Sequence, residues 1–212
     1  MHFQDHRMAT ILAALYIIGI AVESMSGAIS AGRKQMDLFG VITIAVITAL
    51  GGGSVRDIML GYYPLTWIET PGYIILTVCA AVVAITLANY VIRMKKIFLI
   101  LDAIGLVTFA YLGCTLGYEV THSVTIAVIM AMVTGVSGGM MRDILCNDIP
   151  LVFRSELYAS VAMLVGMGQC VVLVFWHNNI YSTIAILIIG FLIRLLAIYK
   201  KVYLPLINYT EW

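Results

Sequence analysis

Two clusters of small residues, each followed by an Arg-Asp pair, are the residues of this chain whose types and spacing could do chemistry. They are Gly51, Gly52, Gly53, Arg56 and Asp57, and then Ser137, Gly138, Gly139, Arg142 and Asp143. Both clusters lie inside long apolar runs. An ionisable side chain inside a membrane span costs at least about 2.5–3.5 kcal/mol unless it is paired or hydrated. We therefore expect the pairs to hold helices together and to set the electrostatics of a central polar pathway. A purely structural brace is the alternative.

Two more acidic side chains, Glu23 and Asp102, and the hydroxyls of Thr48 and Thr134 also lie inside apolar runs. Glu23 has no cationic neighbour in sequence, so we expect it to face water, a permeating cation or one of the two arginines. A protonated, hydrogen-bonded buried acid is the alternative for Glu23. Arg194 lies in the last apolar run, near its inner end, and we expect its long side chain to snorkel to the membrane interface.

The glycine clusters predict irregular helices. Each glycine costs about 1 kcal/mol of helix propensity relative to alanine, so the clusters predict a kink or break near the membrane midplane. Backbone freed in this way is tolerated at that depth only where it is buried in protein or lines a wet cavity. Close packing of helices through small residues is the alternative.

The order of the charges predicts how they pair. Adjacent residues of a helix point about 100° apart, because a turn takes about 3.6 residues. We therefore expect the arginine of each cluster to meet the aspartate of the other. A break would also place each aspartate in the first turn of a second half-helix, where the helix dipole favours a carboxylate.

The composition sets the class of protein. Hydrophobic residues make up 62% of the 212 residues and charged residues only 11%, with a net charge of +1. Average soluble domains carry roughly 45–50% apolar and about 25% charged residues. A soluble enzyme, a disordered chain and a nucleic-acid binder are therefore excluded, and the long continuous runs exclude a transmembrane barrel. No hydrolase, metalloprotease or phosphate-loop motif is present, and the four cysteines have no paired spacing. We expect neither an enzyme, nor a cofactor, nor a bound metal.

Seven apolar runs are long enough to span a bilayer core, which takes about 20 helical residues. They are residues 10–30, 38–62, 73–92, 97–117, 124–146, 157–176 and 181–199. Basic residues gather in the loops after the first, third and fifth runs and in the C-terminal tail: Arg33, Lys34, Arg93, Lys95, Lys96, Arg154, Lys200 and Lys201, whereas the opposite side carries Arg7. Cytoplasmic loops are enriched in Lys and Arg, so the N-terminus is expected outside and the C-terminus in the cytoplasm of a cell (inner or plasma) membrane.

Sliding the chain along itself by 86 residues aligns the two clusters without a gap. The shared pattern is GG-x-x-RDI-x5-PL. Each copy contains three spans, an odd number, so the copies must be oppositely oriented, as in many transport proteins. We assign repeat one to residues 8–93, repeat two to 96–178 and an added helix to 181–203, all within one membrane domain over 1–212. The fold class is thus an all-α polytopic membrane protein with seven transmembrane helices, two inverted three-helix repeats plus a seventh helix.

Four sequence segments resemble the prokaryotic trimeric intracellular cation (TRIC) channel family, whose members are also labelled glycine transporters or UPF0126 proteins. They are GGGSVRDI followed by Pro64, SGGMMRDI followed by Pro150, RSELYA at residues 154–159, and GAISAGRKQMDLFGV at residues 27–41. The resemblance covers nearly the whole chain. It implies a homotrimer with a pore within each protomer, lined by the first, second, fourth and fifth runs, and conduction of monovalent cations, chiefly K⁺, with Na⁺ as a second ion. Membrane lipids are the other implied partners.

Three positions depart from the resemblance, and the replacement of a glycine of the second cluster by Ser137 is the mildest of these changes. Many relatives carry an acid where this chain has Tyr16, and an aromatic or small residue where it has Glu23. The lining of the first half of the pore is therefore expected to be unusual.

The leading hypothesis is a passive K⁺ channel in which the glycine-broken helices expose carbonyls to the ion. Glu23 and Asp102 would bias the path toward cations. The alternative is a secondary transporter of a small zwitterion such as glycine, because a carrier also needs an inverted repeat around a polar centre. A membrane scaffold without flux is a third class.

Overall fold

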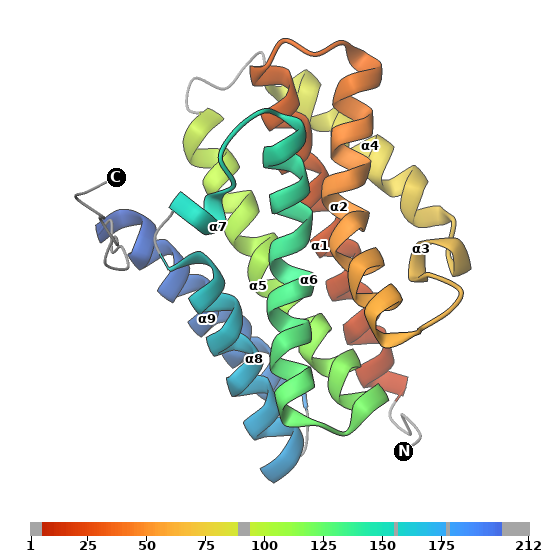
Figure 1. The fold of residues 1–212 in the computed structure, drawn as a ribbon, viewed down its shortest axis with the longest axis vertical. Coiled ribbons are helices and arrows are strands. Elements are labelled where there is room, and N and C mark those ends of the chain that lie inside the picture. Colours follow the sequence, from red (N-terminus) through yellow and green to blue (C-terminus); the bar gives the residue numbers. More distant parts are fainter. Residues whose placement is uncertain (1–5, 89–93, 155–156, 177–178, 201–212) are drawn as a thin grey trace, which may run out of the picture.

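The computed structural model describes residues 6–88, 94–154, 157–176 and 179–200, and within these ranges the chain is helical, with turns and short loops. Its helices are α1 (His6–Arg33), α2 (Leu38–Leu60), α3 (Thr66–Glu69), α4 (Gly72–Ala88), α5 (Met94–Thr121), α6 (Val124–Leu145), α7 (Leu151–Arg154), α8 (Tyr158–Phe175) and α9 (Ile180–Lys200) (Figure 1). The basic residues Arg93 and Lys201 and the pair Ser155-Glu156 lie outside the described residues.

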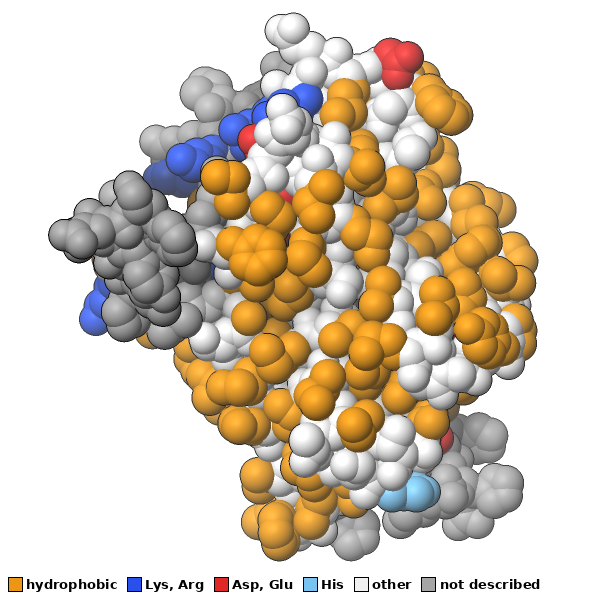
Figure 2. Space-filling model, in the orientation of Figure 1, with side chains coloured by type: hydrophobic (Ala, Val, Ile, Leu, Met, Phe, Trp, Pro, Cys, Tyr) orange, Lys and Arg blue, Asp and Glu red, His pale blue; other side chains and the backbone are white. Residues whose placement is uncertain are grey.

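Six of the described helices are long and apolar enough to cross a membrane, and α4 is a shorter apolar helix of 17 residues. The all-helical membrane fold predicted from composition is confirmed. Hydrophobic side chains cover much of the molecule's flank, while the Lys and Arg side chains visible on this face lie at its upper end and on its left edge (Figure 2). Large exposed side chains such as Phe39 and Phe175 belong to this apolar surface. Exposure on this scale fits a lipid-facing surface rather than a water-facing one. The two short helices α3 and α7 were not predicted.

The 86-residue repeat is present in the structure, because α1 to α4 correspond in order to α5 to α8. Each half ends its second long helix in the same turn. The Tyr62 backbone N–H donates to the Asp57 carbonyl at 2.8 Å, and the Asp148 N–H donates to the Asp143 carbonyl at 2.8 Å. Helices α2 and α6 lie side by side and run in opposite directions, as an inverted repeat requires (Figure 1).

Four helices form the centre of the molecule: α1 packs on α2 and α5, and α6 packs on α2 and α5. Helix α4 covers α1, α8 covers α5 and α6, and α9 packs on the outside of α8 and α5. A hydrogen bond of 2.8 Å between the hydroxyls of Tyr111 and Thr183 ties α9 to α5. The central position of α1, α2, α5 and α6 brings the residues singled out above into the interior.

Candidate functional site

The glycine clusters lie where α2 crosses α6. A Cβ atom added to Gly52 would collide with the carbonyl oxygen of Thr134, and one added to Gly138 would collide with the carbonyl oxygen of Thr48. Both contacts would be closer than 3.0 Å, which real Cβ atoms essentially never show. The two glycines therefore let the backbones of α2 and α6 touch, and they do so symmetrically in the two repeats.

The predicted break of these helices is wrong. Helix α2 runs unbroken through Gly51–Gly53, and α6 runs unbroken through the second cluster. The neighbouring hydroxyls bond within their own helices: Ser137 Oγ donates to the Val133 carbonyl at 2.6 Å, and Thr48 and Thr134 each donate to the carbonyl four residues earlier, also at 2.6 Å. The helix packing gained at the crossing outweighs the low propensity of glycine, so close packing through small residues is the correct interpretation.

The other glycines of the clusters face side chains. Gly51 lies against Met141, whose Sδ would be 3.1 Å from an added Cβ. Gly53 lies beneath the hydroxyl of Tyr16, and Gly139 beneath the hydroxyl of Tyr158. Each cluster thus accommodates one tyrosine hydroxyl, although α1 supplies the first and α8 the second.

Arg56 and Asp57 form a closed hydrogen-bonded cluster at the end of α2. Arg56 donates from Nε and Nη2 to Asp57 Oδ1 at 2.9 and 2.6 Å, and its Nη2 also donates to Thr66 Oγ1 at 3.1 Å. Asp57 Oδ2 accepts from the Thr66 backbone N–H at 2.9 Å and from its hydroxyl at 2.8 Å. The ring of Tyr16 lies 5.9 Å from the guanidinium. Each charged group of this first cluster is therefore compensated.

Arg142 and Asp143 form the corresponding cluster in α6, with more partners. Arg142 Nε donates to Asp143 Oδ1 at 2.8 Å, and its Nη1 donates to Asp102 Oδ1 and to Ser26 Oγ, both at 2.7 Å. Asp143 Oδ2 accepts from the Leu151 backbone N–H at 2.8 Å. Arg142 is fully buried, so these contacts, rather than water, stabilise its positive charge.

The predicted exchange of partners between the repeats is wrong, because each arginine bonds to the aspartate next to it. The guanidinium has a long stem and a planar fork of donors, so it can fold back onto its neighbour despite the angle between adjacent residues. The aspartate stays in place because its second oxygen accepts a backbone N–H from α3 or α7. Since the helices are unbroken, Asp57 and Asp143 lie near the C-terminal ends of α2 and α6 rather than in the first turn of a half-helix.

Glu23 of α1 faces this second cluster, as one of the expectations from sequence required. Its side chain packs directly on Gly105 of α5 and interacts electrostatically with Asp102, Arg142 and Asp143. Glu23 is 2% exposed and Asp102 is 1% exposed. Three buried polar atoms of the cluster have no hydrogen-bond partner among the described residues: Glu23 Oε2, Asp102 Oδ2 and Arg142 Nη2.

Sequence reasoning missed several residues around Arg142. Phe98 lies under the guanidinium, with its ring centroid 4.6 Å away, and the Tyr158 hydroxyl donates to Asp102 Oδ1 at 3.2 Å. The expectation for Arg194 is wrong, since this residue is fully buried and stacks 4.6 Å above the Tyr158 ring instead of reaching the interface. Tyr158 lies within the RSELYA segment, which was the one available signal.

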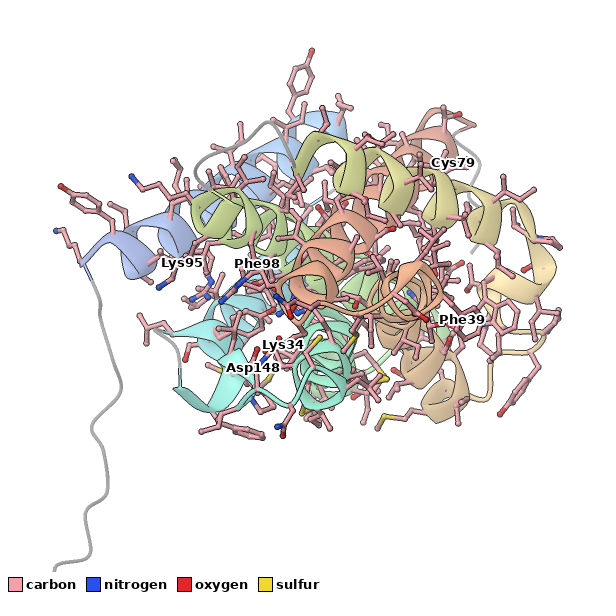
Figure 3. All side chains as sticks on the ribbon, turned by 90° about the horizontal axis from the view of Figure 1, so that it is seen from above. Lys34, Phe39, Cys79, Lys95, Phe98 and Asp148 are labelled. Atoms are coloured by element: carbon pink, nitrogen blue, oxygen red, sulfur yellow. The ribbon has the colours of Figure 1, made fainter. Side chains whose placement is uncertain are left out.

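The two clusters remain separate sites. Among the described residues, no hydrogen bond or ion pair joins Arg56 or Asp57 to the Arg142 cluster. At the end of the molecule seen in Figure 3, Lys34 from the α1–α2 loop and Asp148 from the α6–α7 loop form an ion pair of 2.8 Å that links the two halves. In the part of the chain that the structure describes, no group of three or more His, Cys, Asp or Glu side chains could hold a metal ion.

Comparisons with known proteins identify relatives over nearly the whole chain. The family model described as Glycine transporter matches residues 13–89 and 99–173, one segment in each repeat. The inner membrane protein YadS of Escherichia coli, which carries the family designation UPF0126, is 34% identical over 201 residues, covering 90% of this chain and 93% of YadS.

Two solved structures of prokaryotic channels are similar to this chain in both fold and sequence. A TRIC trimeric intracellular cation channel orthologue from Rhodobacter sphaeroides has a TM-score of 0.87 and 29% identity, covering 91% of this chain and all of that one. A prokaryotic TRIC channel crystallised in 0.5 M KCl has a TM-score of 0.84 and 34% identity, covering 91% of this chain and 98% of that one.

Proposed function

This chain belongs to the UPF0126 membrane-protein family, whose model is described as Glycine transporter, and we propose that it conducts monovalent cations, chiefly K⁺, through a pore in each protomer. The observation that carries the proposal is the Arg142 cluster at the crossing of two inverted repeats, in a fold closely similar to prokaryotic TRIC cation channels. Buried ionisable groups inside a membrane protein mark ion or substrate pathways by default.

The route runs between α1, α2, α5 and α6, and side chains rather than free carbonyls define it. Because α2 and α6 are unbroken, their carbonyls stay in helical hydrogen bonds, and the ion meets the carboxylates of Glu23 and Asp102. Arg56, Asp57 and Arg142 fix the surrounding field. The glycine contact between α2 and α6 is where a small separation of the helices opens the path.

The assembly, placement and organisation follow the same proposal. The similar channel from Rhodobacter sphaeroides is described as trimeric, and we assign a homotrimer to this chain. The E. coli relative is an inner membrane protein, and we assign the same membrane here, with the N-terminus outside because exposed Arg33, Lys34, Lys95 and Lys96 lie on the opposite side. The whole chain acts as one membrane domain of two repeats plus α9.

Transport of a small zwitterion such as glycine is the second candidate function. The free donor of Arg142 and the free acceptors of Glu23 and Asp102 would suit a carboxylate and an ammonium group, respectively. The description of the family model points the same way.

Currents across a planar bilayer decide between the two functions. The purified protein should give unitary currents whose reversal potential follows the K⁺ gradient. As a matched control, Glu119→Gln removes a carboxylate from an exposed position of α5 and should leave the currents unchanged. Absence of current together with saturable counterflow of labelled glycine would refute the channel and support the carrier.

A further inference from the structure

In the buried middle of α1 and α5, the two repeats differ in charge at two pairs of matching positions. Shifting by 86 residues, Tyr16 of α1 corresponds to Asp102 of α5, and Phe109 of α5 corresponds to Glu23 of α1. The aromatic pair is in contact: the rings of Tyr16 and Phe109 meet edge to face with centroids 5.9 Å apart. The α1–α5 interface therefore contains an aromatic pair in one half of the molecule and two carboxyl groups in the other.

Packing alone does not require a carboxyl group at Glu23. The ring of Phe109 fills the space over Gly19, where an added Cβ would be 3.2 Å from its Cζ, just as Glu23 fills the space over Gly105. An aromatic ring thus does the same steric work at the matching position. The acidic group of Glu23 must be explained by its charge or its hydrogen bonding.

The charges around Glu23 do not balance. Among the residues that the structure describes, Glu23, Asp102 and Asp143 present three carboxyl groups to the guanidinium of Arg142, whereas the first cluster pairs Arg56 with Asp57 one to one. Arg194 of α9 lies on the other side of Tyr158, with its guanidinium 4.6 Å from the centre of that ring. Removing an uncompensated carboxylate from water is expensive, so a buried carboxyl group is protonated, is paired with a cationic side chain or coordinates an ion.

Two carboxyl oxygens of this cluster are available to bind a positive charge. Glu23 Oε2 and Asp102 Oδ2 are both fully shielded from solvent and accept no hydrogen bond. The two side chains come from adjacent helices, and Asp102 precedes Gly105, on which Glu23 packs, by one helical turn. Arg142 Nη2 also lacks an acceptor and can donate to a water molecule that accompanies an ion.

We propose that Glu23 and Asp102 together bind one monovalent cation, and that this site makes the conducting path asymmetric between the two repeats. Two free carboxylate oxygens suit a weakly held K⁺ or Na⁺ better than Ca²⁺, which takes six to eight oxygen ligands, or Mg²⁺, which demands an octahedron. This inference rests on the proposed cation conduction and assigns a cation-binding site along the conducting path.

Thermal unfolding of the purified full chain tests this site without measuring flux. The wild type should melt several degrees higher in KCl than in N-methyl-D-glucamine chloride of equal ionic strength, because a ligand that binds only the folded state stabilises it. Glu23→Gln keeps the size of the side chain and removes its charge, so most of that difference should disappear. Glu23→Phe, which copies Phe109, should lose it as well, while Glu119→Gln should keep it.

Equilibrium dialysis with radioactive rubidium provides a second measurement. The wild type should bind one ion per chain, and Glu23→Gln should weaken binding by roughly tenfold or more, a change of about 1.4 kcal/mol. Glutamine imitates a protonated glutamic acid. If the melting temperature depends on K⁺ equally in wild type and Glu23→Gln, and both bind rubidium equally, the charge of Glu23 binds no ion and the site is overturned. Stabilisation by glycine that depends on Glu23, with none by K⁺, would also overturn it.

A K⁺ flux assay on the same preparations separates the site from the proposed function. Flux without Glu23-dependent binding leaves the channel standing and removes the site. Glu23-dependent binding without flux leaves the site standing and removes the channel.

Discussion

The contact between α2 and α6 yields a quantitative prediction for Gly52→Ala. The added methyl group would point at the Thr134 carbonyl oxygen at less than 3.0 Å, whereas ordinary contact begins at 3.4 Å. A backbone oxygen in the middle of a helix cannot rotate away, so α2 and α6 must separate. Gly138→Ala should do the same from the other side, against the Thr48 carbonyl oxygen.

Two opposing terms set the size of the effect. Overpacking a well-packed interior costs roughly 1–3 kcal/mol, and a rigid backbone neighbour places Gly52→Ala at the upper end. Alanine regains about 1 kcal/mol of helix propensity relative to glycine. We therefore expect a net loss of about 2 kcal/mol, which corresponds to a fall in the melting temperature of roughly 4–8 °C for a chain of this length.

Gly32→Ala is the matched control, because Gly32 lies in α1 with nothing within 4 Å of an added Cβ. It should gain up to about 1 kcal/mol from propensity alone. Melting temperatures in detergent should thus move in opposite directions for the two variants. The double variant Gly52→Ala, Gly138→Ala should lose less than the sum of the single losses, because the first methyl group has already separated the helices.

A Gly52→Ala protein as stable as Gly32→Ala would refute this reasoning. It would mean that α2 and α6 do not touch at Gly52 and that the glycines serve another purpose. If the loss of stability in the double variant equals the sum of the two single losses, Gly52 and Gly138 do not act at one common contact between α2 and α6.

Three further predictions concern hydrogen bonds and ion pairs, all measured by thermal unfolding. Arg142→Lys should destabilise the protein more than Arg56→Lys. Arg142 uses two nitrogen atoms to bond Asp102, Asp143 and Ser26, and the single ammonium group of a lysine cannot reach all three. Equal losses of stability in the two variants would show that the additional partners of Arg142 add nothing. Lys34→Gln should change stability by less than about 1 kcal/mol, because the ion pair with Asp148 is roughly one-third exposed, and a larger loss would reveal a latch between the halves. Thr183→Val should cost about 0.5–1.5 kcal/mol by removing one hydrogen bond of the Tyr111 hydroxyl, and unchanged stability would show that α9 does not depend on this bond.

Much of the fold could be predicted because the signals were local. The length of the apolar runs predicts which segments span, and the identical spacing of the Arg-Asp motif predicts the repeat before any contact is known. The short helices α3 and α7 were missed because their contribution is not local: each supplies the backbone N–H that holds an aspartate of the preceding long helix.

The candidate site could be predicted in its members but not in its connections. The sequence by itself determined that Glu23, Asp102, Arg142 and Asp143 lie in apolar spans, since burial in a membrane follows from the neighbouring residues. Only the tertiary structure decided that the glycines join α2 to α6 instead of breaking them, that each arginine folds back onto its own aspartate, and that Arg194 is buried over Tyr158. These outcomes depend on where the helices cross. The packing of α1 on α5 places Glu23 near Asp102 in one half of the molecule and Tyr16 against Phe109 at the matching positions of the other half. The two copies of the repeat therefore have different electrostatic environments.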